Sequence, residues 1–145
     1  MIVGFGFTKL LAEKHESAKG KIDINNNVSV KEAKEDSFSI GKDRQSIIKF
    51  IFEFTSKYEP NIGTILFEGE VLYLDEPKKV KEILSAWKKD KKIPSEIMGN
   101  LLNTILAKCN VQALILSQEI NLPPPIPMPK VQMAPPPEEK ENYVG

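Results

Sequence analysis

The sequence has few of the side chains that perform catalysis or hold metal ions. Its 145 residues include one histidine, His15, and one cysteine, Cys109. A lone thiol forms no intramolecular disulfide, and a metal site would have to combine scattered carboxylates with at most one imidazole and one thiol. His15 lies in the charged stretch EKHES with no nucleophile at local spacing, and Cys109 falls on the apolar side of a predicted helix. We therefore expect a protein that is not an enzyme, binds no cofactor or metal, and resides in a reducing compartment, the cytoplasm.

The chain also lacks net charge and long apolar runs. Lysine and arginine number 20, as do aspartate and glutamate, so there is no overall basic field to attract nucleic acid. No apolar run approaches the roughly 18 residues that a membrane helix needs, and no positive charge precedes the apolar start MIVGFGFTKLL. We expect no membrane insertion and no leader peptide, one domain over residues 1–132, and a disordered Pro/Glu-rich tail over residues 133–145.

Alternation of apolar and polar positions predicts the first two extended segments. In residues 3–7, bulky side chains alternate with glycines, and a phosphate-binding loop would need a third glycine where Lys9 stands. In residues 22–30, Asn26 interrupts the apolar face, which leaves a bulge or a short hairpin, and we favour the bulge. The charged stretch KEAKEDSFSIGKDR that follows is expected to be a surface link.

The third and fourth extended segments form the clearest pair. The stretch SIIKFIFEFTSKY places Ile48, Phe50, Phe52 and Phe54 on one side, and TILFEGEVLYL follows a turn with proline, asparagine and glycine. We expect an antiparallel hairpin. Both parities of the fourth segment are partly apolar, so we expect this segment to have cover on both sides and to lie centrally or at an interface.

Helical spacing of apolar residues begins after residue 74. Pro77 follows an acidic start, and Val80, Ile83, Leu84 and Trp87 then predict an amphipathic helix over 77–93 whose lysines form its solvated side. A second helix begins near Pro94 and extends for about 25 residues. Beyond Asn110 this helix is apolar nearly all round, so either the segment that follows it or another subunit should cover its second face.

Most of the eleven prolines lie in INLPPPIPMPKVQMAPPP, residues 120–137, which we call the proline segment. Aliphatic side chains stand between these prolines, and a polyproline II segment has little entropy to lose on docking. We expect Leu122, Ile126 and Met128 to be docked side chains of a strap on the chain's own sheet or helix. A groove on another subunit or partner, and a free linker, are the alternatives.

The order of elements indicates an α+β fold, in which a four-stranded antiparallel sheet is followed by two helices packed on one face and by the proline segment. At IIKFIFEFTSKYEPNIGTILFEGEVLYL and CNVQALILSQEINLPPPIPMP the sequence resembles the SecB-like chaperone family, over residues 5–130. The resemblance implies an ATP-independent holding chaperone that assembles as a dimer of dimers and cradles unfolded or export-bound chains, a role in protein transport. The family is acidic whereas this chain is neutral, which argues against contact with the translocase motor.

A binding role also follows from the residues themselves. The first and third segments carry five phenylalanines, more than two helices should cover, and exposed apolar patches usually mark interaction surfaces. The candidate polypeptide-binding side chains are Phe5, Phe7, Ile51, Leu66 and Trp87. One alternative is a structural or assembly subunit that turns the same surface to one fixed protein partner. A lesser alternative is RNA binding through the Lys-rich helix, with Trp87 as a stacking surface.

Overall fold

The computed structural model describes residues 1–17, 20–40 and 43–127, without the side chains of 37–40 and 43–44. Four strands precede two helices: β1 (Ile2–Lys14), β2 (Asp23–Ile40), β3 (Asp43–Glu59), β4 (Gly63–Asp75), α1 (Pro77–Asp90) and α2 (Ser95–Glu119). The predicted α+β fold is confirmed. The predicted domain end at residue 132 and the predicted tail over 133–145 lie outside the described residues.

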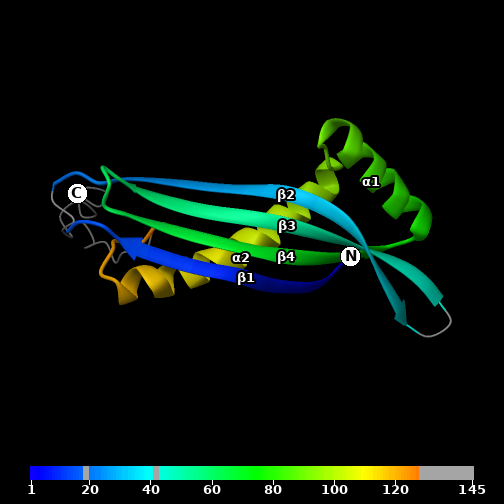
Figure 1. Cartoon of the computed structure of the whole chain (residues 1–145), viewed down its shortest axis with the longest axis horizontal. Helices are drawn as coiled ribbons and strands as arrows, with labels where there is room; N and C mark the ends of the chain where they lie inside the picture. The colour runs from blue at the N-terminus through cyan, green and yellow to red at the C-terminus, as the bar shows by residue number, and fades with distance from the viewer. Residues whose placement is uncertain (18–19, 41–42, 128–145) are drawn as a thin grey trace, which may run out of the picture.

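The four strands form one antiparallel sheet in the order β1-β4-β3-β2, so β1 and β2 are its two edges. β4 is central, as predicted, because it pairs with β1 on one side and β3 on the other. Figure 1 shows a long, narrow sheet that α2 crosses diagonally, with α1 beside the twisted end of β2. We call the sheet face that α2 covers the helix face and the other the open face.

The predicted surface link was wrong. β2 continues through Lys31–Asp36 to Ile40, and β3 begins at Asp43, so most of the charged stretch is strand. An edge strand with one solvated face accepts these residues because their side chains meet water while the main chain pairs with β3. The expected bulge at Asn26 was also wrong, since Asn25 to Asn27 pair regularly with Lys57 to Thr55. The register shift in β2 falls between Val30 and Glu32 instead.

The core lies between α2 and the helix face. α2 buries one residue in every four: Ile97, Leu101, Ile105, Cys109, Ala113 and Ser117. Side chains four residues apart form a ridge along which a helix packs. This ridge winds slowly around α2 as the helix crosses the twisted strands. The sheet contributes fully enclosed side chains from β3 and β4, including Phe50, Phe52, Phe54, Ile65 and Phe67. The predicted length and apolar face of the second helix are confirmed.

The open face has no helix over it within the described residues. In β4 every odd-numbered side chain up to Val71 is buried, whereas Leu66 and Leu72, which point to the open face, are only half-buried. Among the described residues β4 is therefore covered on one side, and cover of its other side at an interface stays a prediction. Cross-strand neighbours shelter these leucines in part, since Leu66 lies between Leu11 and Thr55. Neither described helix is long and apolar enough to cross a membrane.

Candidate functional site

The five predicted binding side chains do not come together. Phe5 and Phe7 pair with Val71 and Gly69 of β4 and therefore point to the helix face. Ile51 and Leu66 belong to the opposite parity of β3 and β4 and point to the open face, half-buried. Trp87 packs inward from α1 and is only 6% exposed. A client on one face would thus meet at most part of this set.

Phe5, Phe7, Phe52, Phe54 and Phe67 form an aromatic cluster that runs from the core to the β1 edge. Phe5 stacks on Phe52 with ring centroids 5.3 Å apart, and Phe7 meets Phe67 edge to face at 5.5 Å. Phe52 and Phe67 are fully enclosed, whereas Phe5 and Phe7 are half-buried. The two helices therefore cover the rings of β3 and leave those of β1 partly open, at the edge of the sheet.

Apolar side chains are also exposed on β1 and on the C-terminal half of α2. Val3 and Leu10 of β1 are each 46% exposed, and Val111 and Ile115 of α2 are 59% and 46% exposed. Figure 1 shows the C-terminal end of α2 emerging past β1. We define the β1–α2 apolar surface as Val3, Phe5, Phe7 and Leu10 of β1 with Val111 and Ile115 of α2. The second face of α2, which the sequence predicts to be covered, is thus partly bare in the single chain.

The described part of the proline segment lies against its own chain. Leu122 is 5% exposed, and its N–H donates to the carbonyl of Ser117 at 2.8 Å, which turns the chain back after α2. A Cβ at Gly63 would lie 3.1 Å from Cδ1 of Leu122, so glycine leaves room for this leucine. Ile126 is half-buried and packs less tightly, and Met128 lies outside the described residues.

Three polar side chains on the helix face hold this segment. The Tyr58 hydroxyl donates to the carbonyl of Pro123 at 2.6 Å, and Asn26 Nδ2 donates to the carbonyl of Pro125 at 2.7 Å. Ser56 Oγ in turn donates to Asn26 Oδ1 at 2.5 Å. The sequence signal was the break that Asn26 makes in an otherwise apolar strand face, which we interpreted as a bulge.

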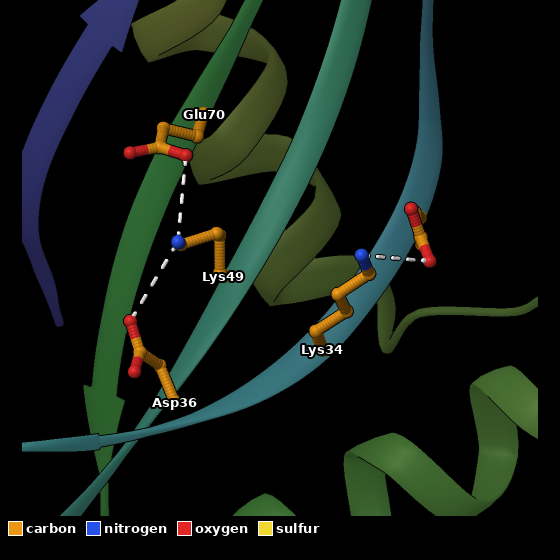
Figure 2. A network of polar contacts seen from close by, with 5 residues as sticks. Lys34, Asp36, Lys49 and Glu70 are labelled. Carbon is orange, nitrogen blue, oxygen red and sulfur yellow. Dashed lines mark ion pairs between the residues drawn. The ribbon is translucent and has the colours of Figure 1, made fainter.

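The open face carries charge pairs between strands. Lys49 Nζ of β3 lies 3.7 Å from Asp36 of β2 and 3.6 Å from Glu70 of β4, so it bridges three strands (Figure 2). Figure 2 also shows Lys34 pairing on β2, where its Nζ lies 3.3 Å from Glu32. Such pairs are partly exposed and contribute little stability, but they keep much of this face hydrated. The open face is consequently a poorer apolar site than the β1–α2 surface.

The titratable groups of the core are poor candidates for chemistry. Burial raises the pKa of Cys109 to about 12, so its thiol stays protonated and weakly nucleophilic near neutral pH. Burial likewise raises the pKa of Tyr58 to about 12, which keeps its hydroxyl a donor to Pro123. His15 is exposed, and the described residues contain no group of three potential metal-ligating His, Cys, Asp or Glu side chains. The arrangement suits contact with another polypeptide better than catalysis.

Comparison with known proteins identifies the class of fold. No protein-family model and no curated protein matches the chain. Among solved structures, the chain is similar to the SecB-like chaperone Rv1957 of Mycobacterium tuberculosis, in complex with a ChAD peptide from the Rv1956 HigA1 antitoxin. The likeness has a TM-score of 0.51 and covers 93% of this chain and 91% of that chain, at 13% identity. The fold is therefore SecB-like, as the resemblance predicted, and the relationship is distant.

Proposed function

We propose that this chain is a polypeptide-binding protein of the holding-chaperone type, which acts without ATP and without catalysis. The observation that carries the proposal is the β1–α2 apolar surface, where Val3, Leu10, Val111 and Ile115 stay exposed. Exposed apolar patches usually mark interaction sites. That a SecB-like chaperone of the same fold is in complex with an antitoxin peptide supports this assignment.

The edge position of β1 explains how such a surface would take varied sequences. Among the described strands β1 pairs with β4 alone, so its outer edge presents main-chain donors and acceptors to an added strand. Main-chain hydrogen bonds are the same for every client, and the half-buried rings of Phe5 and Phe7 select only for apolar side chains. Extended, unfolded or export-bound chains are the class of client that this combination fits, in the cytoplasm.

The same surface would also serve assembly. A dimer, or a dimer of dimers, would cover Val111 and Ile115 if two copies of α2 met, and sedimentation of the isolated chain measures this directly. A fixed protein partner would cover the surface permanently, which is the assembly-subunit alternative. Both uses depend on the same exposed side chains, so only a functional assay separates them from client holding.

The test is suppression of aggregation of an unrelated unfolded enzyme by the purified protein at stoichiometric ratio. We expect suppression, and we expect the double variant Val111→Lys/Ile115→Lys to lose most of it, because two charges would enter the apolar surface. Asn103→Lys adds a charge at another exposed position of α2 and should leave suppression unchanged. If the wild-type protein is inert and co-purifies with one defined complex, the assembly function replaces this proposal.

A further inference from the structure

A groove of about 510 Å³ lies at the other edge of the sheet, between β2 and α1. Seven residues line it: Ala33, Lys34 and Glu35 of β2, and Lys81, Leu84, Ser85 and Lys88 of α1. Figure 1 shows α1 running beside the twisted end of β2. Since β1 and β2 are opposite edges, this groove is separate from the β1–α2 apolar surface.

The groove carries an excess of positive charge. Four lining residues form one face of α1. Leu84 and Ser85 lie three and four residues after Lys81, and Lys88 lies four and three residues after them. No described carboxylate lies within 4.0 Å of Lys81 or Lys88. Lys34 is paired with Glu32 at 3.3 Å, and Glu35 is the only carboxylate among the lining residues. A ligand would thus meet two lysines with no pairing carboxylate on one wall.

The floor and the opposite wall of the groove suit an extended main chain. Ala33 and Leu84 are half-buried and apolar, which gives a partner's side chains a dry contact. β2 pairs only with β3 among the described strands, so the outer main-chain groups of Ala33 to Glu35 have no strand beside them. A bare strand edge of this kind accepts an added strand.

We propose that this groove binds an extended acidic segment of a partner protein, which adds along β2 while its carboxylates pair with Lys81 and Lys88. The two lysines are separated by about 10.5 Å of helix rise. Carboxylates two or four residues apart on an extended chain are separated by about 7 or 14 Å. The four-carbon stem of each lysine covers the difference in either case. Alternating acidic and apolar residues would place carboxylates on the α1 side and apolar groups elsewhere in the groove.

RNA is the other anionic ligand to consider, and the structure favours the peptide. Sequence-tolerant binding of single-stranded RNA combines basic residues with aromatic faces on which bases stack. The aromatic ring of α1, Trp87, is 6% exposed, and Lys91 Nζ already lies 5.2 Å from its centroid. No ring is therefore offered to a base on the described surface of this groove.

The test measures fluorescence anisotropy of a fluorescein-labelled peptide that alternates Glu and Val, with a Gln-Val peptide as the uncharged match. We expect the Glu-Val peptide to bind more tightly, and its affinity to fall between about 50 mM and about 300 mM salt because exposed ion pairs are screened. Lys81→Gln/Lys88→Gln should weaken it roughly three- to tenfold. The control Lys79→Gln/Lys89→Gln removes the same charge from positions of α1 that do not line the groove, and should leave affinity unchanged.

Main-chain pairing is tested separately. Two Glu-Val peptides, N-methylated on the odd or on the even residues, keep all charges but lose alternate N–H donors, so at least one should lose binding. Equal binding of both to the level of the parent peptide overturns the strand addition. Three outcomes overturn the proposal of an acidic ligand: the Gln-Val peptide binds equally well, no peptide binds, or single-stranded oligouridine binds in place of the peptide. The groove variants should suppress aggregation like wild type, so this proposal and the chaperone proposal fail independently.

Discussion

The hydroxyl of Tyr58 donates a 2.6 Å hydrogen bond to the carbonyl oxygen of Pro123, and so joins the end of β3 to the chain that leaves α2. Tyr58 is 1% exposed and Pro123 is half-buried, so the bond is partly shielded from water. Prolines have no N–H, so the carbonyls of a proline-rich stretch pair only with donors from elsewhere. The bond fixes the direction in which the proline segment begins to run across the helix face.

Tyr58→Phe should therefore lower the free energy of unfolding by about 1 kcal/mol, because the Pro123 carbonyl loses its donor while the ring still fills its place. Tyr73→Phe is the matched control. Its hydroxyl bonds Asp75 at 3.1 Å from a half-buried position, and its loss should change stability by less than about 0.5 kcal/mol. Urea denaturation of both variants measures the difference, and equal losses would show that the Tyr58 bond contributes nothing special.

Asn26 and Ser56 should behave as one unit. Ser56 is fully buried, and Asn26 Oδ1 accepts its hydroxyl while Asn26 Nδ2 reaches Pro125. Asn26→Ala leaves the buried hydroxyl without an acceptor and should cost about 1–2 kcal/mol, whereas the double change Asn26→Ala/Ser56→Ala should cost less than the sum of the single changes. Asn25→Ala, on an exposed neighbour, serves as the control. Strict additivity in the double-mutant cycle would contradict the coupling.

Sequence patterns predicted well the elements whose signals all lie within the element itself. The hairpin of β3 and β4 has strong alternation on its first arm and a turn of proline, asparagine and glycine, and Asn61 does adopt the left-handed conformation, with φ of 47°. The helix starts near Pro77 and Pro94 were also predicted to within a few residues.

The features that patterns did not predict depend on partners far away in the chain. The charge over residues 31–36 predicted a surface link. The segment is a strand because its main chain pairs with β3 while one of its faces stays open to water. The polar side chain of Asn26 appeared to mark a bulge, but its partner is Pro125, 99 residues away. Of the five candidate binding residues, strand parity alone would have separated Phe5 and Phe7 from Ile51 and Leu66 once the sheet order was known.

Stability should fall in alkaline solution, because the core holds two weak acids in their protonated forms. The pKa of Cys109 is raised by burial from its ordinary 9.0 to about 12, and that of Tyr58 from 10.0 to about 12. Between these values the unfolded chain loses protons that the folded chain keeps, so the stability present below pH 9 is lost as pH rises toward 12. For the fully buried Cys109 the loss at pH 10 should be about 1 kcal/mol.

The check compares wild type with Cys109→Ala by urea denaturation at pH 8 and pH 10. The variant starts from lower stability because the substitution leaves a small cavity. Its free energy of unfolding should nevertheless decrease less than that of wild type between the two pH values, by about the loss attributed to Cys109. Ellman's reagent should react with Cys109 slowly in the folded protein and rapidly in urea. A rapid reaction at pH 8 without denaturant would show that the thiol is not buried in solution.

Gly69 of β4 and Gly6 of β1 are diagonal neighbours, because Gly69 pairs with Phe7 and Gly6 with Glu70. They should respond in opposite ways to alanine. A Cβ at Gly69 would lie 2.5 Å from Cζ of Phe52 and closer still to the carbonyl oxygen of Gly6, whereas a Cβ at Gly6 would meet nothing within 4 Å. Gly69→Ala should therefore push Phe52 out of the aromatic cluster and lower the free energy of unfolding by about 1–3 kcal/mol. Gly6→Ala should be neutral or slightly stabilising, because it restricts the unfolded chain and fits a strand.

Since Phe52 supports Phe5 through their 5.3 Å stack, Gly69→Ala should also weaken client binding on β1 while Gly6→Ala does not. Equal stability of the two variants would mean that the close approach of Gly69 to Phe52 does not exist in solution.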